Sequence, residues 1–90
     1  MLLHLFLLAA PSERYFQTLP ASCLHPSLRF DAIHVKAEML LLRHTQFSWK
    51  ARVHALNIIR QLFLDRNITI EDRFVEPALM LACEAIASSV

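Results

Sequence analysis

The chain of 90 residues contains no glycine. Ordinary usage of about 7% would give roughly six glycines in a chain this long. Tight hairpin turns, left-handed backbone and close approach of the backbone to a phosphate usually need glycine, because it has no Cβ atom. Glycine-rich phosphate-binding loops and Rossmann fingerprints are therefore excluded, and β-rich folds are disfavoured. Helices joined by short connectors are the expected structure.

The residues that are present are unusually apolar. Hydrophobic residues make up 56% of the chain, against about 45 to 50% in an ordinary soluble domain. A domain this small buries only roughly 60% of its unfolded surface, so the excess suggests a surface that more protein covers. Nine lysine and arginine residues against eight aspartate and glutamate residues give a net charge of +1, which offers no bulk electrostatic case for nucleic-acid binding.

The first ten residues, MLLHLFLLAA, look like the apolar part of a signal peptide. The run is too short to span a bilayer, which takes about 20 apolar residues. It has no positively charged start, contains His4, and is followed by Pro11 where cleavage would fall. We therefore expect a helix of the buried type that lacks its neighbours because the chain starts late. The protein is expected to be cytoplasmic and to have no membrane partner. A small secreted helical protein is the alternative, and only then would the glycosylation sequon at Asn67 matter.

Three prolines, Pro11, Pro20 and Pro26, divide the first thirty residues into short pieces. Proline cannot continue a helix because it lacks the N–H group and clashes with the preceding turn. The breaks predict these short elements: helices over residues 2–9 and 12–18, and a loop over residues 20–27. We divide the chain into a poorly defined helical segment, residues 1–30, and a helical-repeat segment, residues 31–90.

Two longer helices follow in the second segment. Asp31 can cap a helix over residues 32–44, whose apolar positions are Ile33, Ala37, Leu40 and Leu41. Ser48 is the expected N-cap of the next helix, which runs to about Leu64. At 100° per residue its apolar side chains fall in one arc, made of Ala55, Leu56, Ile58, Ile59, Leu62 and Phe63. That arc is the expected core face of the clearest amphipathic helix in the chain.

The last helix is expected over residues 76–87, with Pro77 in its first turn. Its apolar side contains Leu79, Met80, Cys83 and Ile86. Residues 68–70, Ile-Thr-Ile, have a strand-like composition, but three residues between helices favour a connector. Helices with wide apolar faces and short connectors predict an all-α fold, and more specifically an α-solenoid fragment of HEAT or armadillo type.

No residue pattern predicts a catalytic, cofactor or metal site. His34, His44 and His54 recur every ten residues, not at the spacing of three or four that puts two imidazoles on one helical face. Cys23 and Cys83 are sixty residues apart, so we expect two reduced, buried thiols instead of a disulfide or a zinc site. Neither cysteine lies in a recognisable nucleophile motif. The chain is therefore expected to be no enzyme and to need no cofactor.

Basic residues around the helix after Ser48 could contact phosphate. Lys50, Arg52, His54 and Arg60 form a modest basic stripe there, and lysine and arginine neutralise phosphate charge. The alternative is a solvated helical face.

The same helix resembles part of a known family. The run VHALNIIRQLF at residues 53–63, followed by Asp65, is similar to a distinctive stretch of the thyroid adenoma-associated protein family. The likeness extends from about Phe47 to Val90. Family members continue with a connector, an apolar helix and a Trp-containing segment; residues 74–86 look like that apolar helix, and the chain ends where the Trp segment would begin.

The resemblance implies a piece of a very large HEAT or armadillo-repeat protein, the non-catalytic partner of a 2′-O-methyltransferase that acts on the tRNA anticodon loop. S-adenosylmethionine would bind the partner enzyme and not this chain. His54, Asn57 and Arg60 are the matched polar positions, expected either to contact the enzyme or tRNA or to form hydrogen bonds that are buried or that join adjoining repeats. The rival hypothesis is a generic helical protein-interaction module, or an inactive fragment of a gene model.

Overall fold

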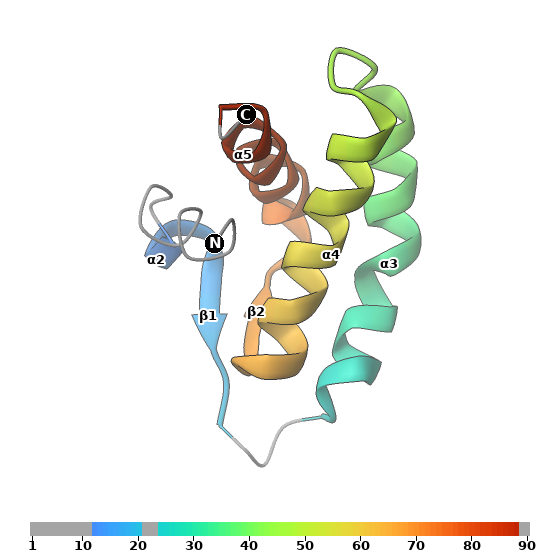
Figure 1. Cartoon of the computed structure of the whole chain (residues 1–90). Coiled ribbons are helices and arrows are strands. Elements are labelled where there is room, and N and C mark those ends of the chain that lie inside the picture. The colour runs from blue at the N-terminus through green and yellow to red at the C-terminus, as the bar shows by residue number, and fades with distance from the viewer. Residues whose placement is uncertain (1–11, 21–23, 89–90) are drawn as a thin grey trace.

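Three helices packed against one another form the body of the protein (Figure 1). The computed structural model describes residues 12–20 and 24–88. The long helices are α3 (Pro26–Arg43), α4 (Trp49–Asp65) and α5 (Val75–Ser88). The smaller elements are α2 (Ser12–Tyr15), β1 (Phe16–Thr18), β2 (Ile68–Ile70) and the 3₁₀ turn η1 (Asp72–Phe74). The described chain is thus a mostly helical small domain with a two-stranded antiparallel sheet.

Helix α4 forms where the amphipathic pattern places it. The Ser48 hydroxyl accepts a hydrogen bond from the Ala51 amide at 3.1 Å, which satisfies one of the free N–H groups at the start of the helix. Every residue of the predicted core arc is buried except Leu56, which is partly buried. The Phe63 ring meets the Phe30 ring of α3 edge-on, with 5.6 Å between centroids. Helix α4 is therefore the central element against which α3 and α5 pack.

Helix α5 also follows its prediction, extending one residue further at each end than expected. Pro77 lies in its first turn, where the missing N–H group removes no helical hydrogen bond. Of the four predicted apolar positions, Leu79, Cys83 and Ile86 are buried and Met80 is partly buried.

Helix α3 begins at Pro26 and not after Asp31, so the predicted cap is wrong. The His25 ring caps the helix instead, because its Nδ1 accepts a hydrogen bond from the Ser27 amide at 3.3 Å. Pro26 provides the first helical position, where proline is favoured, and Asp31 lies exposed inside the helix. The predicted apolar positions are all buried: Ile33, Ala37, Leu40 and Leu41.

A two-stranded antiparallel sheet joins a segment near the start of the described chain to the segment between α4 and α5. Phe16 of β1 lies opposite Ile70 of β2, and Thr18 lies opposite Ile68. The connector predicted for residues 68–70 is therefore wrong, and so is the helix predicted to continue to Thr18. The strands form because their pairing buries Phe16 and Ile70 in the same core. The all-α expectation is corrected to a mostly helical fold, and the described residues show no repeat.

Asn67 supplies the left-handed backbone that glycine would ordinarily provide after a helix. Its φ angle is 53°, and it directly follows Arg66, the C-cap of α4. Asparagine enters this region more readily than most residues that carry a Cβ atom. Its Oδ1 accepts a hydrogen bond from Arg29 Nη2 at 2.6 Å, and its Nδ2 donates one to the Leu19 carbonyl. Asn67 therefore holds the end of α4 to the first turn of α3 and to the segment after β1.

Replacing Asn67 separates its backbone role from its side-chain role. N67G keeps the left-handed freedom but loses the hydrogen bonds to Arg29 and Leu19, which should lower the free energy of unfolding by about 1–3 kcal/mol. N67A loses the same bonds and also forces a Cβ atom into the left-handed region, at a further cost of about 1 kcal/mol. Urea denaturation followed by circular dichroism measures both. An N67A variant as stable as N67G would contradict the importance of the positive φ angle.

Candidate functional site

The polar residues that carry the family resemblance lie together on the solvent side of α4. His54, Asn57 and Arg60 are all exposed, and their spacing of three places them on successive turns of one broad face. Within the described part of the chain, no hydrogen bond or ion pair occupies the side chain of His54 or Asn57. The Arg60 guanidinium lies 5.9 Å from the centroid of the Phe30 ring. We call these three residues the α4 polar face.

Arg52 does not contribute to the basic stripe expected around this helix. Its Nη1 donates a hydrogen bond to the Leu41 carbonyl at 2.8 Å, and its guanidinium lies 5.1 Å from the centroid of the exposed Trp49 ring. Arg52 therefore secures the turn between α3 and α4. The other members of the stripe, Lys50, His54 and Arg60, remain exposed, so the surface is less basic than the sequence indicates.

Two of the three evenly spaced histidines, His34 and His44, make contacts in separate places of the fold. His34 Nε2 lies 2.8 Å from Glu38 Oε1 on α3, and His44 Nε2 lies 3.4 Å from Glu76 Oε2 on α5. Across residues 12–20 and 24–88, no group of three or more His, Cys, Asp or Glu side chains is arranged to hold a metal.

The buried Arg29 side chain links α3 to the end of α4, a link that was not predicted from the sequence. Arg29 is only 9% exposed. Besides Asn67, its guanidinium donates to the Phe63 carbonyl at 3.4 Å and to the Leu24 carbonyl. These acceptors belong to the chain itself, so the guanidinium ties α3 to the end of α4. The burial of Arg29 could have been predicted from its position on the same helical face as Ile33. That prediction requires knowing that α3 starts before Arg29.

The side-chain nitrogen of Asn67, the attachment atom of the glycosylation sequon, already donates a hydrogen bond. An N-linked glycan attaches to the side-chain nitrogen of asparagine, and in this fold that Nδ2 donates a hydrogen bond to the Leu19 carbonyl. Glycosylation would replace one of the two hydrogens on this nitrogen and place a glycan beside a part-buried contact, so the geometry of Asn67 gives no support to the secreted alternative.

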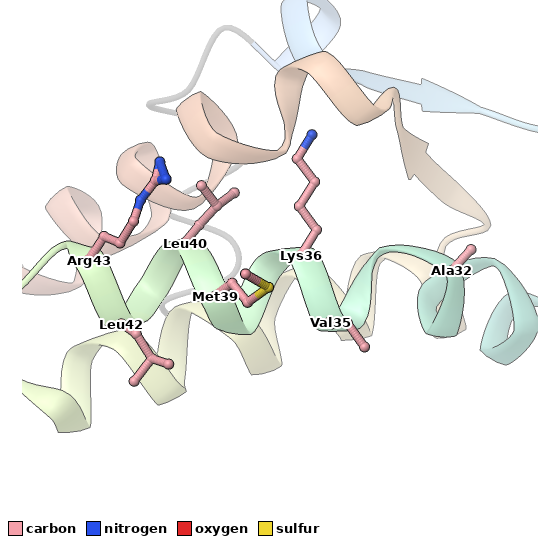
Figure 2. Close-up of a pocket in the computed structure, with 7 residues that line it drawn as sticks. All are labelled: Ala32, Val35, Lys36, Met39, Leu40, Leu42 and Arg43. Carbon is pink, nitrogen blue, oxygen red and sulfur yellow. The ribbon is translucent and has the colours of Figure 1, made fainter.

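Helix α3 carries a second apolar surface, which the sequence reasoning also missed. Leu28, Val35, Met39 and Leu42 are 56–65% exposed, and Ala32 lies exposed among them. We call these five residues the α3 ridge. Figure 2 shows the groove that most of the ridge lines, with Lys36, Leu40 and Arg43 as the further lining residues. The overlooked signal was the alternating spacing of four and three residues along the ridge.

The apolar run at the start of the chain, including the helix predicted over residues 2–9, lies outside the described residues. Among the helices that are described, none is long and apolar enough to cross a membrane.

Cys83 is a buried thiol, as predicted, whereas Cys23 lies outside the described residues. Burial raises the pKa of Cys83 from 9.0 to about 11, although the positive charge of Arg52 acts in the opposite direction. Because the thiolate is the reactive form of cysteine, Cys83 is chemically inert near neutral pH.

The raised pKa of Cys83 should make the domain less stable at alkaline pH. The thiol ionises near pH 9.0 when unfolded but stays protonated to about pH 11 when folded. The folded state therefore binds more protons in this window, so the free energy of unfolding falls as pH rises, by about 2–3 kcal/mol from this group. Urea denaturation of the wild type and of Cys83→Ala across the window measures the effect. Equal pH slopes in the two proteins would contradict it.

Comparison with known protein families, with curated proteins and with solved structures finds no match. The resemblance over residues 53–65 therefore stays a prediction. Two surfaces of the described domain are candidates for binding: the α4 polar face and the α3 ridge.

Proposed function

We propose that the chain is a non-catalytic segment of a cytoplasmic helical-repeat scaffold, which assists a tRNA 2′-O-methyltransferase acting on the anticodon loop. The observation that carries the proposal is the α4 polar face. The three polar residues that match the thyroid adenoma-associated protein family, His54, Asn57 and Arg60, all lie exposed on one side of one helix. A partner can reach all three at once.

The chemistry of this face suits recognition. An asparagine amide offers both a donor and an acceptor, and arginine offers a planar set of donors that fits carboxylate or phosphate. A net charge of +1 supports only a few contacts with phosphate, because affinity for tRNA grows with the number of phosphates neutralised. In this proposal protein contact provides most of the affinity, and methyl transfer takes place on the enzyme with its S-adenosylmethionine.

The finer fold assignment, an α-solenoid, belongs to the same proposal. Helices α3 and α4 are joined by a short turn and pack side by side, which is the basic unit of HEAT and armadillo repeats. Further repeats would continue this arrangement and bury apolar surface that the domain leaves exposed.

A generic protein-interaction module is the second candidate, and the α3 ridge favours it. Four large apolar side chains more than half exposed on one helix are typical of a protein-binding surface. This candidate needs neither tRNA nor a methyltransferase.

Co-purification with a tRNA 2′-O-methyltransferase tests the proposed function. The wild-type chain should associate with the enzyme and increase 2′-O-methylation of anticodon-loop nucleotides, measured by mass spectrometry of digested tRNA. Replacing His54, Asn57 and Arg60 by alanine should weaken association about tenfold or more, a loss of about 1.4 kcal/mol.

The control replaces two polar residues away from α4, Arg73→Ala and Glu84→Ala, both at exposed positions. It should associate as the wild type does. Circular dichroism checks that all variants fold. Failure of the wild type both to associate and to increase methylation would refute the proposal.

A further inference from the structure

The α3 ridge follows a seven-residue period. Its members, Leu28, Ala32, Val35, Met39 and Leu42, are separated by four, three, four and three residues. This average spacing of 3.5 is the pattern of helices that pair in a left-handed coiled coil. The buried residues of α3, such as Ile33, Ala37 and Leu40, lie on the opposite side of the helix. The ridge therefore faces away from the domain's own core.

Charges of opposite sign follow the two flanks of the ridge. In the heptad nomenclature Ala32 and Met39 occupy a positions. Asp31 and Glu38 then fall at g positions on one flank, and Lys36 and Arg43 fall at e positions on the other. In paired helices the e and g residues determine the partner and its orientation.

We propose that the α3 ridge binds the same ridge of a second copy of this chain, with the two α3 helices parallel. In a parallel pair each g residue meets the e residue five positions further along the partner helix. Asp31 then faces Lys36 of the second copy, and Glu38 faces Arg43, on both sides of the seam. An antiparallel pair would bring e against e and g against g, setting base against base and acid against acid. Charge complementarity therefore selects the parallel dimer.

The flanking side chains are available for these contacts. Asp31 is exposed and has no ion-pair partner among the described residues, and Glu38 contacts only His34 within its own helix. Lys36 Nζ lies 2.6 Å from Asp72 Oδ2. An ammonium has three donors and a guanidinium has five, so Lys36 and Arg43 can each contact a carboxylate on either side.

The length of the ridge limits the affinity of the dimer. Fifteen residues from Leu28 to Leu42 extend about 22 Å along a helix, which is two heptads. The interface is at the small end of specific interfaces, and we expect a dissociation constant of about 10 µM. The inference rests on α3, whereas the enzyme or tRNA contacts of the methylation proposal lie on α4, so the dimer and the methylation effect can be tested separately.

Sedimentation velocity over a range of concentrations tests the dimer. The wild type should convert from monomer to dimer around 10 µM, and Met39→Glu should raise the dissociation constant at least about 100-fold, because it places a charge in the seam. Leu24→Glu is the matched control: Leu24 is 66% exposed but precedes the ridge, so this variant should dimerise as the wild type does. A wild type that stays monomeric at several hundred micromolar, or an undiminished Met39→Glu dimer, would overturn the proposal.

Cysteine cross-linking tests the orientation. In the parallel dimer the two copies of residue 42 face each other, so Leu42→Cys should form a disulfide-linked dimer under mild oxidation, above the background of the wild-type cysteines. In an antiparallel dimer these residues would be about 21 Å apart, too far to be joined. A dimer in solution that gives no excess cross-link through residue 42 would overturn the parallel arrangement.

Charge reversal tests the pairing of the flanks. The variant Asp31→Lys with Glu38→Lys makes both flanks basic, and the variant Lys36→Glu with Arg43→Glu makes both acidic. Each alone should be monomeric, whereas an equal mixture should form a heterodimer. Circular dichroism checks folding, because the second variant also loses the contacts to Asp72 and Glu76. Folded variants that each dimerise as strongly as the wild type would contradict the charge pairing.

Discussion

The hydrogen bonds around Asn67 determine how this glycine-free chain can turn at the end of α4. Helices commonly end with a residue in the left-handed region, and here a side chain that tolerates the region also makes the tertiary contacts. Oδ1 of Asn67 meets Arg29 at 2.6 Å, while its backbone carbonyl accepts from the Leu19 amide at 3.0 Å. Three segments that are distant in sequence therefore meet at one residue.

The position of Arg29 adds an electrostatic reason for this junction. The last carbonyls of a helix lack partners within the helix and carry the negative end of its dipole. Arg29 brings a buried positive charge to this end of α4 and donates to the Phe63 carbonyl at 3.4 Å. A buried charge is tolerated only when hydrogen bonds replace its lost water. The Arg29 guanidinium therefore depends on acceptors at the end of α4 and also stabilises that end.

The parts of the fold that local chemistry determines could be predicted from the sequence. Ser48 and the apolar arc specify α4, and Pro77 with its following apolar positions specifies α5. The two errors at the strands occurred where a distant partner decides the local structure. Residues 68–70 become a strand because Phe16 and its neighbours pair with them, and no pattern within three residues can reveal that. The exposed places of His54, Asn57 and Arg60 follow from the helical period, whereas the Arg29 junction required knowledge of how α3 and α4 meet.

Helix α3 shows why the chain is more apolar than a domain of its size requires. One side of α3 is buried against α4 and α5, and the other carries Leu28, Val35, Met39 and Leu42 in water. A helix with two apolar sides is ordinarily sandwiched between neighbours, and one side of this helix has none among the described residues. The flanking charges make the uncovered side selective, because an unmatched or antiparallel helix would meet like charges at the positions of Lys36 and Glu38. The ridge therefore accounts for part of the apolar excess and forms a surface that attracts a helix, while the pattern of charge restricts which helix can bind and in which direction.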